Sequence, residues 1–261
     1  MNVSEEPIAH KEIASEIHKF KSISLEKMNA VSLMKRTDTK YLINVKFLAP
    51  ILDDLQKEYQ VLEVDTRRIM NYSSVYFDTP KFKFYFDHHN GKVNRTKIRQ
   101  RKYVDSDLTF LEIKQKNGKG ETNKSRIQIP NFELDFSTTS KEFISETTGY
   151  AFDLQPSLWN NFKRITLVNL KDNERATIDI DLTYSMNEEE KRYENLVVVE
   201  VKQQRFDRKS MLVKTLKKYR YNPYSISKYC IGIVNLYQDL KYNIFKKKLV
   251  RFNCETATFS C

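Results

Sequence analysis

Hydrophobic and polar residues alternate along much of the chain in short runs, which is the pattern of β-strands with one buried face. In "RTKIRQRKY" (95–103), Arg or Lys occupies alternate positions, and neither Pro nor Gly interrupts the run. Comparable runs bounded by turn residues predict strands over 32–43, 60–64, 68–77, 95–104, 108–117, 122–130, 158–168, 175–184 and 195–203. Strands therefore dominate the predicted structure.

A few segments have helical periodicity instead. The amphipathic N-terminus predicts a helix over roughly the first 20 residues. Further helices are expected over 45–58, 140–148, 207–219 and 229–239, with Asn44 and Asp207 as N-caps and Gly149 as a C-terminal stop. The predicted fold class is α+β.

At least seven of the predicted strands share one property: each has an apolar face and an ionic face on which Arg and Lys dominate. The residues that share these ionic faces are Arg36, Asp38 and Lys40; Glu112, Lys114 and Lys116; Lys124 and Arg126; Arg164; Asp179 and Asp181; and Glu200 and Lys202. Two architectures fit: an open sheet that shows this face to a polyanion such as RNA, or a closed barrel with a charged lumen. A closed lumen with this many cations must be wet and occupied by anions, since unpaired buried charge costs several kcal/mol per ion.

Composition supports an anionic partner. Lys and Arg number 45 against 34 Asp and Glu, which gives a net charge of +11. The sequence contains no long apolar run, so neither a transmembrane span nor a secretory signal is expected, and the expected location is cytoplasmic. The three cysteines have no metal-binding spacing and are expected to be reduced.

The carboxylates on the ionic faces bear on the choice between a binding protein and an enzyme. A nucleic-acid surface gains nothing from acids among its arginines, whereas a phosphoryl-transfer site uses oxygen ligands to hold Mg²⁺ or Mn²⁺ against phosphates. Glu200 is the best ligand candidate because it projects from the otherwise apolar strand "VVVEVK". The alternative for Glu200 is an ion pair with a Lys or Arg of a neighbouring strand. For Glu112 and Asp181 the ion pair is favoured.

A family resemblance joins these motifs. The ordered segments "KRTDTKYLI", "YFDTPKFKFYFDHHNGKVNRTKIRQRKY", "FLEIKQKNGKGETNKSRI", "FKRITL", "IDIDL", "VVVEVK" and "SISKY" resemble the catalytic domain of VTC-type polyphosphate polymerases, which are triphosphate tunnel metalloenzymes related to CYTH domains. The resemblance implies a closed antiparallel eight-stranded β-barrel, with helices packed outside and a triphosphate in its lumen. On this basis we expect an N-terminal helical extension (1–30), the tunnel domain (31–240) and a basic C-terminal tail (241–261).

The resemblance also implies roles for individual residues. It places phosphate-gripping catalytic cations at Arg99, Arg101, Lys114, Arg164 and Lys228; substrate-binding residues at Lys40, Arg36, Lys124, Arg126, Lys202 and Ser227; and metal-binding carboxylates at Glu200 and Glu112. Thr177 departs from the basic residue of some relatives, which leaves the roles of Asp179 and Asp181 open.

The implied function is a polyphosphate polymerase that transfers the γ-phosphate of ATP, or of another nucleoside triphosphate, to inorganic polyphosphate with the help of Mn²⁺ or Mg²⁺. Its expected partners are the triphosphate and polyphosphate, with no nucleic acid. One alternative is an inorganic or nucleoside triphosphatase of the same fold. Another, from a different class, is a noncatalytic protein that binds polyphosphate or RNA.

Overall fold

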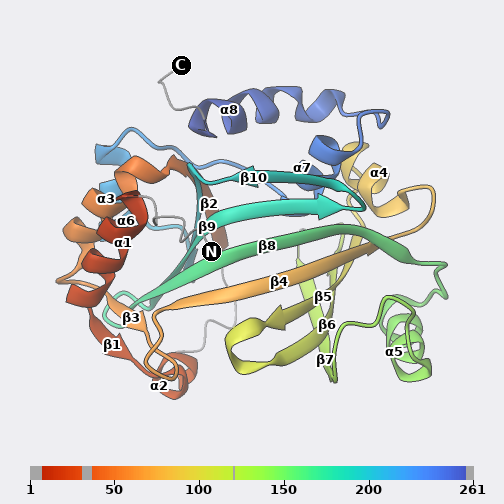
Figure 1. Cartoon of the computed structure of the whole chain (residues 1–261), viewed down its shortest axis with the longest axis horizontal. Coiled ribbons are helices and arrows are strands. Elements are labelled where there is room, and N and C mark those ends of the chain that lie inside the picture. Colours follow the sequence, from red (N-terminus) through yellow and green to blue (C-terminus); the bar gives the residue numbers. More distant parts are fainter. Residues whose placement is uncertain (1–7, 31–36, 120, 257–261) are drawn as a thin grey trace, which may run out of the picture.

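A computed structural model describes residues 8–30, 37–119 and 121–256 of the chain. Its centre is a large, curved sheet (Figure 1). The main path of neighbouring strands is β2 (Thr37–Asn44), β11 (Leu196–Gln203), β9 (Glu174–Met186), β8 (Gln155–Asn169), β4 (Ile69–Asp78), β5 (Arg95–Tyr103), β6 (Leu108–Lys116) and β7 (Thr122–Ile129). All pairs along this path are antiparallel.

Three short strands lie off this path. β10 (Glu189–Tyr193) forms a hairpin with β9, and β3 (Gln60–Leu62) pairs with β8. β1 (Lys21–Ile23) runs parallel to β3. The predicted strands are therefore present with small shifts at their ends, except that 32–36 of the strand predicted over 32–43 lie outside the described residues; β1 and β10 are additional. The mixed α+β class with a large antiparallel sheet is confirmed.

The outer face of the sheet is apolar and is covered by helices. The first group is α1 (Ile8–Lys19), α3 (Leu48–Leu55) and α6 (Met211–Lys218), which cover the alternate apolar residues of β2, β11, β9 and β8 (Figure 1). A second outer core, formed by β4, β5 and β6, is covered by α5 (Thr138–Thr148) and the segments around it. Because alternation buries one set of residues under these helices, it turns the ionic set to the opposite, inner face.

The inner face is covered at one end by C-terminal helices. α7 (Lys228–Leu236) and α8 (Lys246–Thr256) pack there on Leu42, Leu182, Tyr184 and Val198. The remaining elements are α2 (Leu25–Ala30), α4 (Lys83–His89), η1 (Val45–Phe47), η2 (Val104–Ser106) and η3 (Asn243–Phe245). Serine caps begin α6 and α7, because the side chains of Ser210 and Ser227 accept bonds from backbone N–H groups three residues later. The predicted cap at Asp207 is therefore wrong.

The prediction of a closed barrel is wrong. In the described part of the chain, the sheet path ends at β2 on one side and at β7 on the other, and these two strands do not pair. Their inner faces give a physical reason. β2 presents Asp38 and Lys40, and β7 presents Lys124 and Arg126, so three of the four charged groups that closure would bring together across the seam are cations.

The first and last helices of the described residues, α1 and α8, both contribute to the packed cores. The N-terminal segment packs Ile13 and Ile17 of α1 into the core that α3 and α6 share. The segment predicted as a basic tail contains α8, whose Phe252 is fully buried. No helix among the described residues is long and apolar enough to cross a membrane.

Candidate functional site

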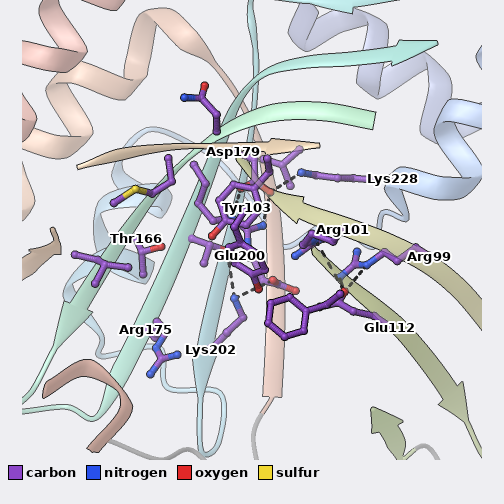
Figure 2. A pocket seen from close by; sticks show the side chains of 18 of the residues that line it. Arg99, Arg101, Tyr103, Glu112, Thr166, Arg175, Asp179, Glu200, Lys202 and Lys228 are labelled. Atoms are coloured by element: carbon purple, nitrogen blue, oxygen red, sulfur yellow. Dashed lines mark hydrogen bonds and ion pairs between the residues drawn. The ribbon is translucent and has the colours of Figure 1, made fainter. Parts of the chain in front are cut away.

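A cavity of about 890 Å³ lies against the inner face of the sheet, between the β5–β7 strands, the β2–β11–β9–β8 strands and the start of α7. Twelve Lys and Arg residues and six Asp and Glu residues line it, so its lining carries six excess positive charges. Figure 2 shows side chains from strands distant in sequence that converge there. This excess favours the binding of an anion with several charges.

Strand alternation and register arrange the cations of β5, β6 and β7 in rows. Lys97 lies opposite Lys114, which lies opposite Lys124. In the next row, Arg99 lies opposite Glu112, which lies opposite Arg126. Opposed like charges destabilise a sheet, so the lysine row costs folding free energy that a bound anion would recover.

Glu112 partly neutralises the second row. Arg99 donates to Glu112 Oε2 from Nε at 2.6 Å, and Arg101 Nε lies 4.0 Å from the same oxygen (Figure 2). Burial raises the pKa of Glu112, but the charges of Arg99, Arg101 and Lys114 outweigh it and lower the pKa to about 2. Glu112 is therefore ionised at neutral pH and holds the two arginines in place.

Lys114 has no such carboxylate partner. It makes no recorded hydrogen bond or ion pair with the described residues, and the charge of Arg99 together with burial lowers its pKa well below the ordinary value. A phosphate group beside Lys114 would reverse this shift, because an opposite charge favours the ammonium form.

Asp179 organises a second cluster across the cavity. It accepts from Arg164 Nε at 2.6 Å and Arg164 Nη2 at 2.8 Å, and from Lys228 Nζ at 2.5 Å. Lys228 is the first residue of α7, and its ammonium group also lies 3.4 Å from the centre of the Phe162 ring. Burial lowers the pKa of Lys228 to about 7, although Asp179 opposes the shift. Arg164 and Lys228 therefore face the cavity as a pair held by one carboxylate.

Asp181 does not join Asp179, although simple alternation predicts that they share a face. The pairing of β8 with β9 shifts between Asn161 and Lys163, and Asp181 has a positive φ of 54°. This irregularity re-phases the strand, as a β-bulge does. Asp181 instead faces His10 of α1 at 2.8 Å and Lys163 at 3.0 Å, and it does not line the cavity.

Glu200 is the third carboxylate of the inner face. Its two oxygens contact the ammonium groups of Lys40 and Lys202, the latter at 3.0 Å. Lys202 also donates to Thr177 Oγ1 at 3.2 Å. Burial raises the pKa of Glu200, but Lys202 and Lys40 outweigh it and hold the pKa well below its usual range.

The carboxylates of the cavity are the candidate ligands for a divalent metal, which prefers oxygen donors. The described residues contain no group of three Asp, Glu, His or Cys side chains arranged to hold a metal. Both oxygens of Glu200 are engaged by lysines, and Glu112 is engaged by Arg99. The contact between Glu200 and Lys40 of the neighbouring strand β2 is the ion pair given above as the alternative for Glu200. Mg²⁺ commonly binds through one or two carboxylates and substrate phosphates, so metal binding by Glu200 and Glu112 stays a prediction.

The structure brings most of the predicted site residues to one cavity. Those that line it are Arg99, Arg101, Lys114, Arg164, Lys228, Lys40, Lys124, Arg126, Lys202, Ser227, Glu200 and Glu112. The prediction for Arg36 lies outside the described residues. Ser227 caps α7 and also accepts from Lys97 Nζ at 2.8 Å.

The lining residues that the sequence did not assign to the site include Tyr103, Asp105 and Arg175. Arg175 and Tyr103 had a usable signal, since each follows the alternation of inner-face residues on its own strand. Asp105 had none, because it lies in η2 and not in a strand.

The comparison with family models matches residues 35–237 to the VTC domain. The chain belongs to the VTC-domain family. Among curated proteins, no sequence matches this VTC domain.

Several solved structures are similar to this chain at low sequence identity. A candidate adenylyl cyclase of Hippeastrum with a dominant triphosphatase activity is 14% identical, with a TM-score of 0.50 over 77% of this chain and 96% of that one. A candidate adenylate cyclase of Vibrio parahaemolyticus is 12% identical, with a TM-score of 0.46 over 77% and 98%. An RNA triphosphatase of S. pombe is 12% identical, with a TM-score of 0.29 over 97% and 96%. The Hippeastrum protein and this VTC domain thus have a common fold.

Proposed function

We propose that this VTC domain binds a nucleoside triphosphate in the cavity and transfers its γ-phosphoryl group to an inorganic polyphosphate chain. The observation that carries the proposal is the lining of twelve cations and six carboxylates, in which Glu112, Asp179 and Glu200 each contact two cations. The lining as a whole keeps an excess of six positive charges. A triphosphate has the charge and the linear shape to bridge the two sides.

The side chains act by position and charge. Arg99 and Arg101 on β5, with Arg164 and Lys228 across the cavity, bind phosphate oxygens and stabilise the charge that shifts during transfer. Arginine suits this role because its planar fork matches two phosphate oxygens. Lys114, Lys124, Arg126, Lys40 and Lys202 add point charges along the bound chain.

The transfer needs no covalent intermediate. The terminal phosphate oxygen of the polyphosphate forms a bond to the γ-phosphorus, the bond from that phosphorus to the β–γ bridging oxygen breaks, and ADP leaves. A divalent ion bound with the triphosphate supplies charge neutralisation, and Glu200 and Glu112 are the residues that would contact it. The protein holds donor and acceptor in line, which is the main source of catalysis in phosphoryl transfer.

A triphosphatase is the second candidate. In that case water takes the place of the polyphosphate acceptor at the γ-phosphorus. The Hippeastrum protein, which has this fold, is described as having a dominant triphosphatase activity, and this favours the alternative for the VTC domain as well. Product analysis separates the two reactions.

The test is to incubate the purified protein with ATP and either Mg²⁺ or Mn²⁺ and to measure long polyphosphate and free phosphate separately. Polymer supports the polymerase, and phosphate without polymer supports the hydrolase. The double variant Arg99→Ala with Arg101→Ala should lose at least a hundredfold in rate, since each cation stabilises the transition state by a few kcal/mol. Neither product from the wild-type protein, or full activity in the double variant, would overturn the proposal.

A matched control lies on the same strand. Lys102 is next to Arg101, but alternation turns it to the other face, where it pairs with Asp107 at 2.5 Å. Lys102→Ala also removes a β5 cation and should retain activity. Comparing these variants therefore separates the effect of the cations that line the cavity from the effect of removing a β5 cation on the other face.

A further inference from the structure

The inner face of β5 changes character along its length. Lys97, Arg99, Arg101 and Tyr103 line the cavity in that order, so the strand passes from cations to an aromatic ring. Lys97 and Tyr103 are six residues apart, which is about 20 Å along a strand. The cavity therefore has a cationic end at Lys97 and an aromatic end at Tyr103.

β6 repeats this gradient beside β5. Antiparallel register places Lys114 opposite Lys97, Phe110 opposite Arg101 and Leu108 opposite Tyr103. Along both strands, the inner face thus changes from cationic to aromatic or apolar residues toward the same end of the cavity. Since register fixes these pairs, the gradient is a property of the cavity wall and not of one side chain.

The aromatic end is a defined surface, which we call the aromatic wall: Tyr72, Tyr103, Leu108 and Phe110. The Tyr103 ring centre lies 5.0 Å from that of Tyr72 and 5.8 Å from that of Phe110. Leu108 is 40% exposed although it lines the cavity. Leu25 and Met28 of α2 also line the cavity, and Leu25 is 47% exposed.

Partly exposed apolar groups are unexpected beside a row of cations that binds phosphates. Polyphosphate and inorganic triphosphate carry no apolar surface that could pack on the aromatic wall, whose Tyr72 and Phe110 rings contact cavity arginines. A ligand that joins an anionic chain to a flat apolar group matches both ends of the gradient. Nucleobases have such a face and stack on aromatic side chains.

We propose that the aromatic wall binds the base of the nucleoside triphosphate, with Tyr103 as its main stacking partner. This inference rests on the proposed function, because it assumes that the triphosphate occupies the neighbouring cations. It also orients the substrate. The base lies at the Tyr103 end, and the γ-phosphate points toward Lys97, Lys114 and Lys124, where the acceptor meets it.

The test compares the binding of ATP and of inorganic tripolyphosphate by calorimetry, with Mg²⁺ present for both. The wild-type protein should bind ATP more tightly than tripolyphosphate. Tyr103→Ala should weaken ATP binding by about tenfold, which is the effect of losing one base–aromatic stack, and should leave the affinity for tripolyphosphate unchanged. Tyr103→Phe keeps the ring and should retain the ATP preference.

Tyr150→Ala is the matched control, because Tyr150 is 67% exposed and does not line the cavity. Equal binding of ATP and tripolyphosphate by the wild-type protein, or an equal loss of both in Tyr103→Ala, would overturn the base site and leave the proposed function standing. If neither ligand binds, the proposed function itself fails. The two failures therefore give different results.

Discussion

Removing the Glu112 carboxylate should change stability and anion binding in opposite directions. Glu112→Gln keeps the size and shape of the side chain but removes the negative charge that faces Arg99 and Arg101. The ligand-free protein then holds these arginines beside Lys114 without a counter-charge. A bound triphosphate supplies that charge instead.

The size of the stability loss in Glu112→Gln follows from the pKa of the Glu112 carboxyl. The difference between the ordinary value of 4.5 and about 2 in the folded protein corresponds to about 3 kcal/mol of folding free energy from ionised Glu112. Because the folded pKa is the lower one, this contribution is present above pH 4.5 and is lost as the pH falls through about 2. For a domain of this size, the variant should melt roughly 6 °C below the wild type at pH 7.

The assay is thermal unfolding with and without metal-free tripolyphosphate. Tripolyphosphate should raise the melting temperature of Glu112→Gln by more than that of the wild type, because no Arg99–Glu112 bond has to break. Glu142 is exposed on α5, so Glu142→Gln is the matched control and should change neither value. A variant as stable as the wild type, or one that gains less from tripolyphosphate, would refute the reasoning.

Three further predictions concern the same cavity. Lys114→Met should raise the melting temperature of the ligand-free protein, because Arg99 repels this lysine, and should weaken tripolyphosphate binding about tenfold by calorimetry. Asp179→Asn leaves Arg164 and Lys228 without their carboxylate and should lower the unfolding free energy by about 3–5 kcal/mol in denaturant titrations. Lys228 has a folded pKa of about 7, below its ordinary 10.5, so it makes stability rise with pH between these values; Lys228→Met should reduce that slope. An unchanged slope would contradict the assignment of Lys228.

The strands and their inner faces were predictable because the signal is local. β5 was predicted over 95–104 and is found over Arg95–Tyr103, since uninterrupted alternation fixes both its extent and its faces. The same rule accounts for the strand residues of the cavity, whereas Ser227 and Lys228 at the start of α7 were expected from the family resemblance. Every predicted site residue within the described part of the chain lines the cavity.

The errors arise where the structure depends on long-range contacts. Closure of a barrel depends on whether β2 and β7 meet, and no local pattern states this. The separation of Asp179 from Asp181 depends on one irregular pairing between β8 and β9. The sequence predicts a tail at α8 because lysines dominate the pattern, although Phe252 of α8 and the preceding Phe245 of η3 are buried.

The carboxylates of the cavity have a consequence for selectivity. Glu112, Asp179 and Glu200 serve as built-in counterions, so the ligand-free cavity resembles an inner salt. A small anion such as chloride or a single phosphate can displace one carboxylate at a time from its cations. The displaced carboxylate stays near the bound anion because it belongs to the protein. A chain of linked phosphates replaces several together and incurs the loss of translational freedom only once. The cavity should therefore discriminate between anions by the number of linked phosphates, in the manner of a chelator.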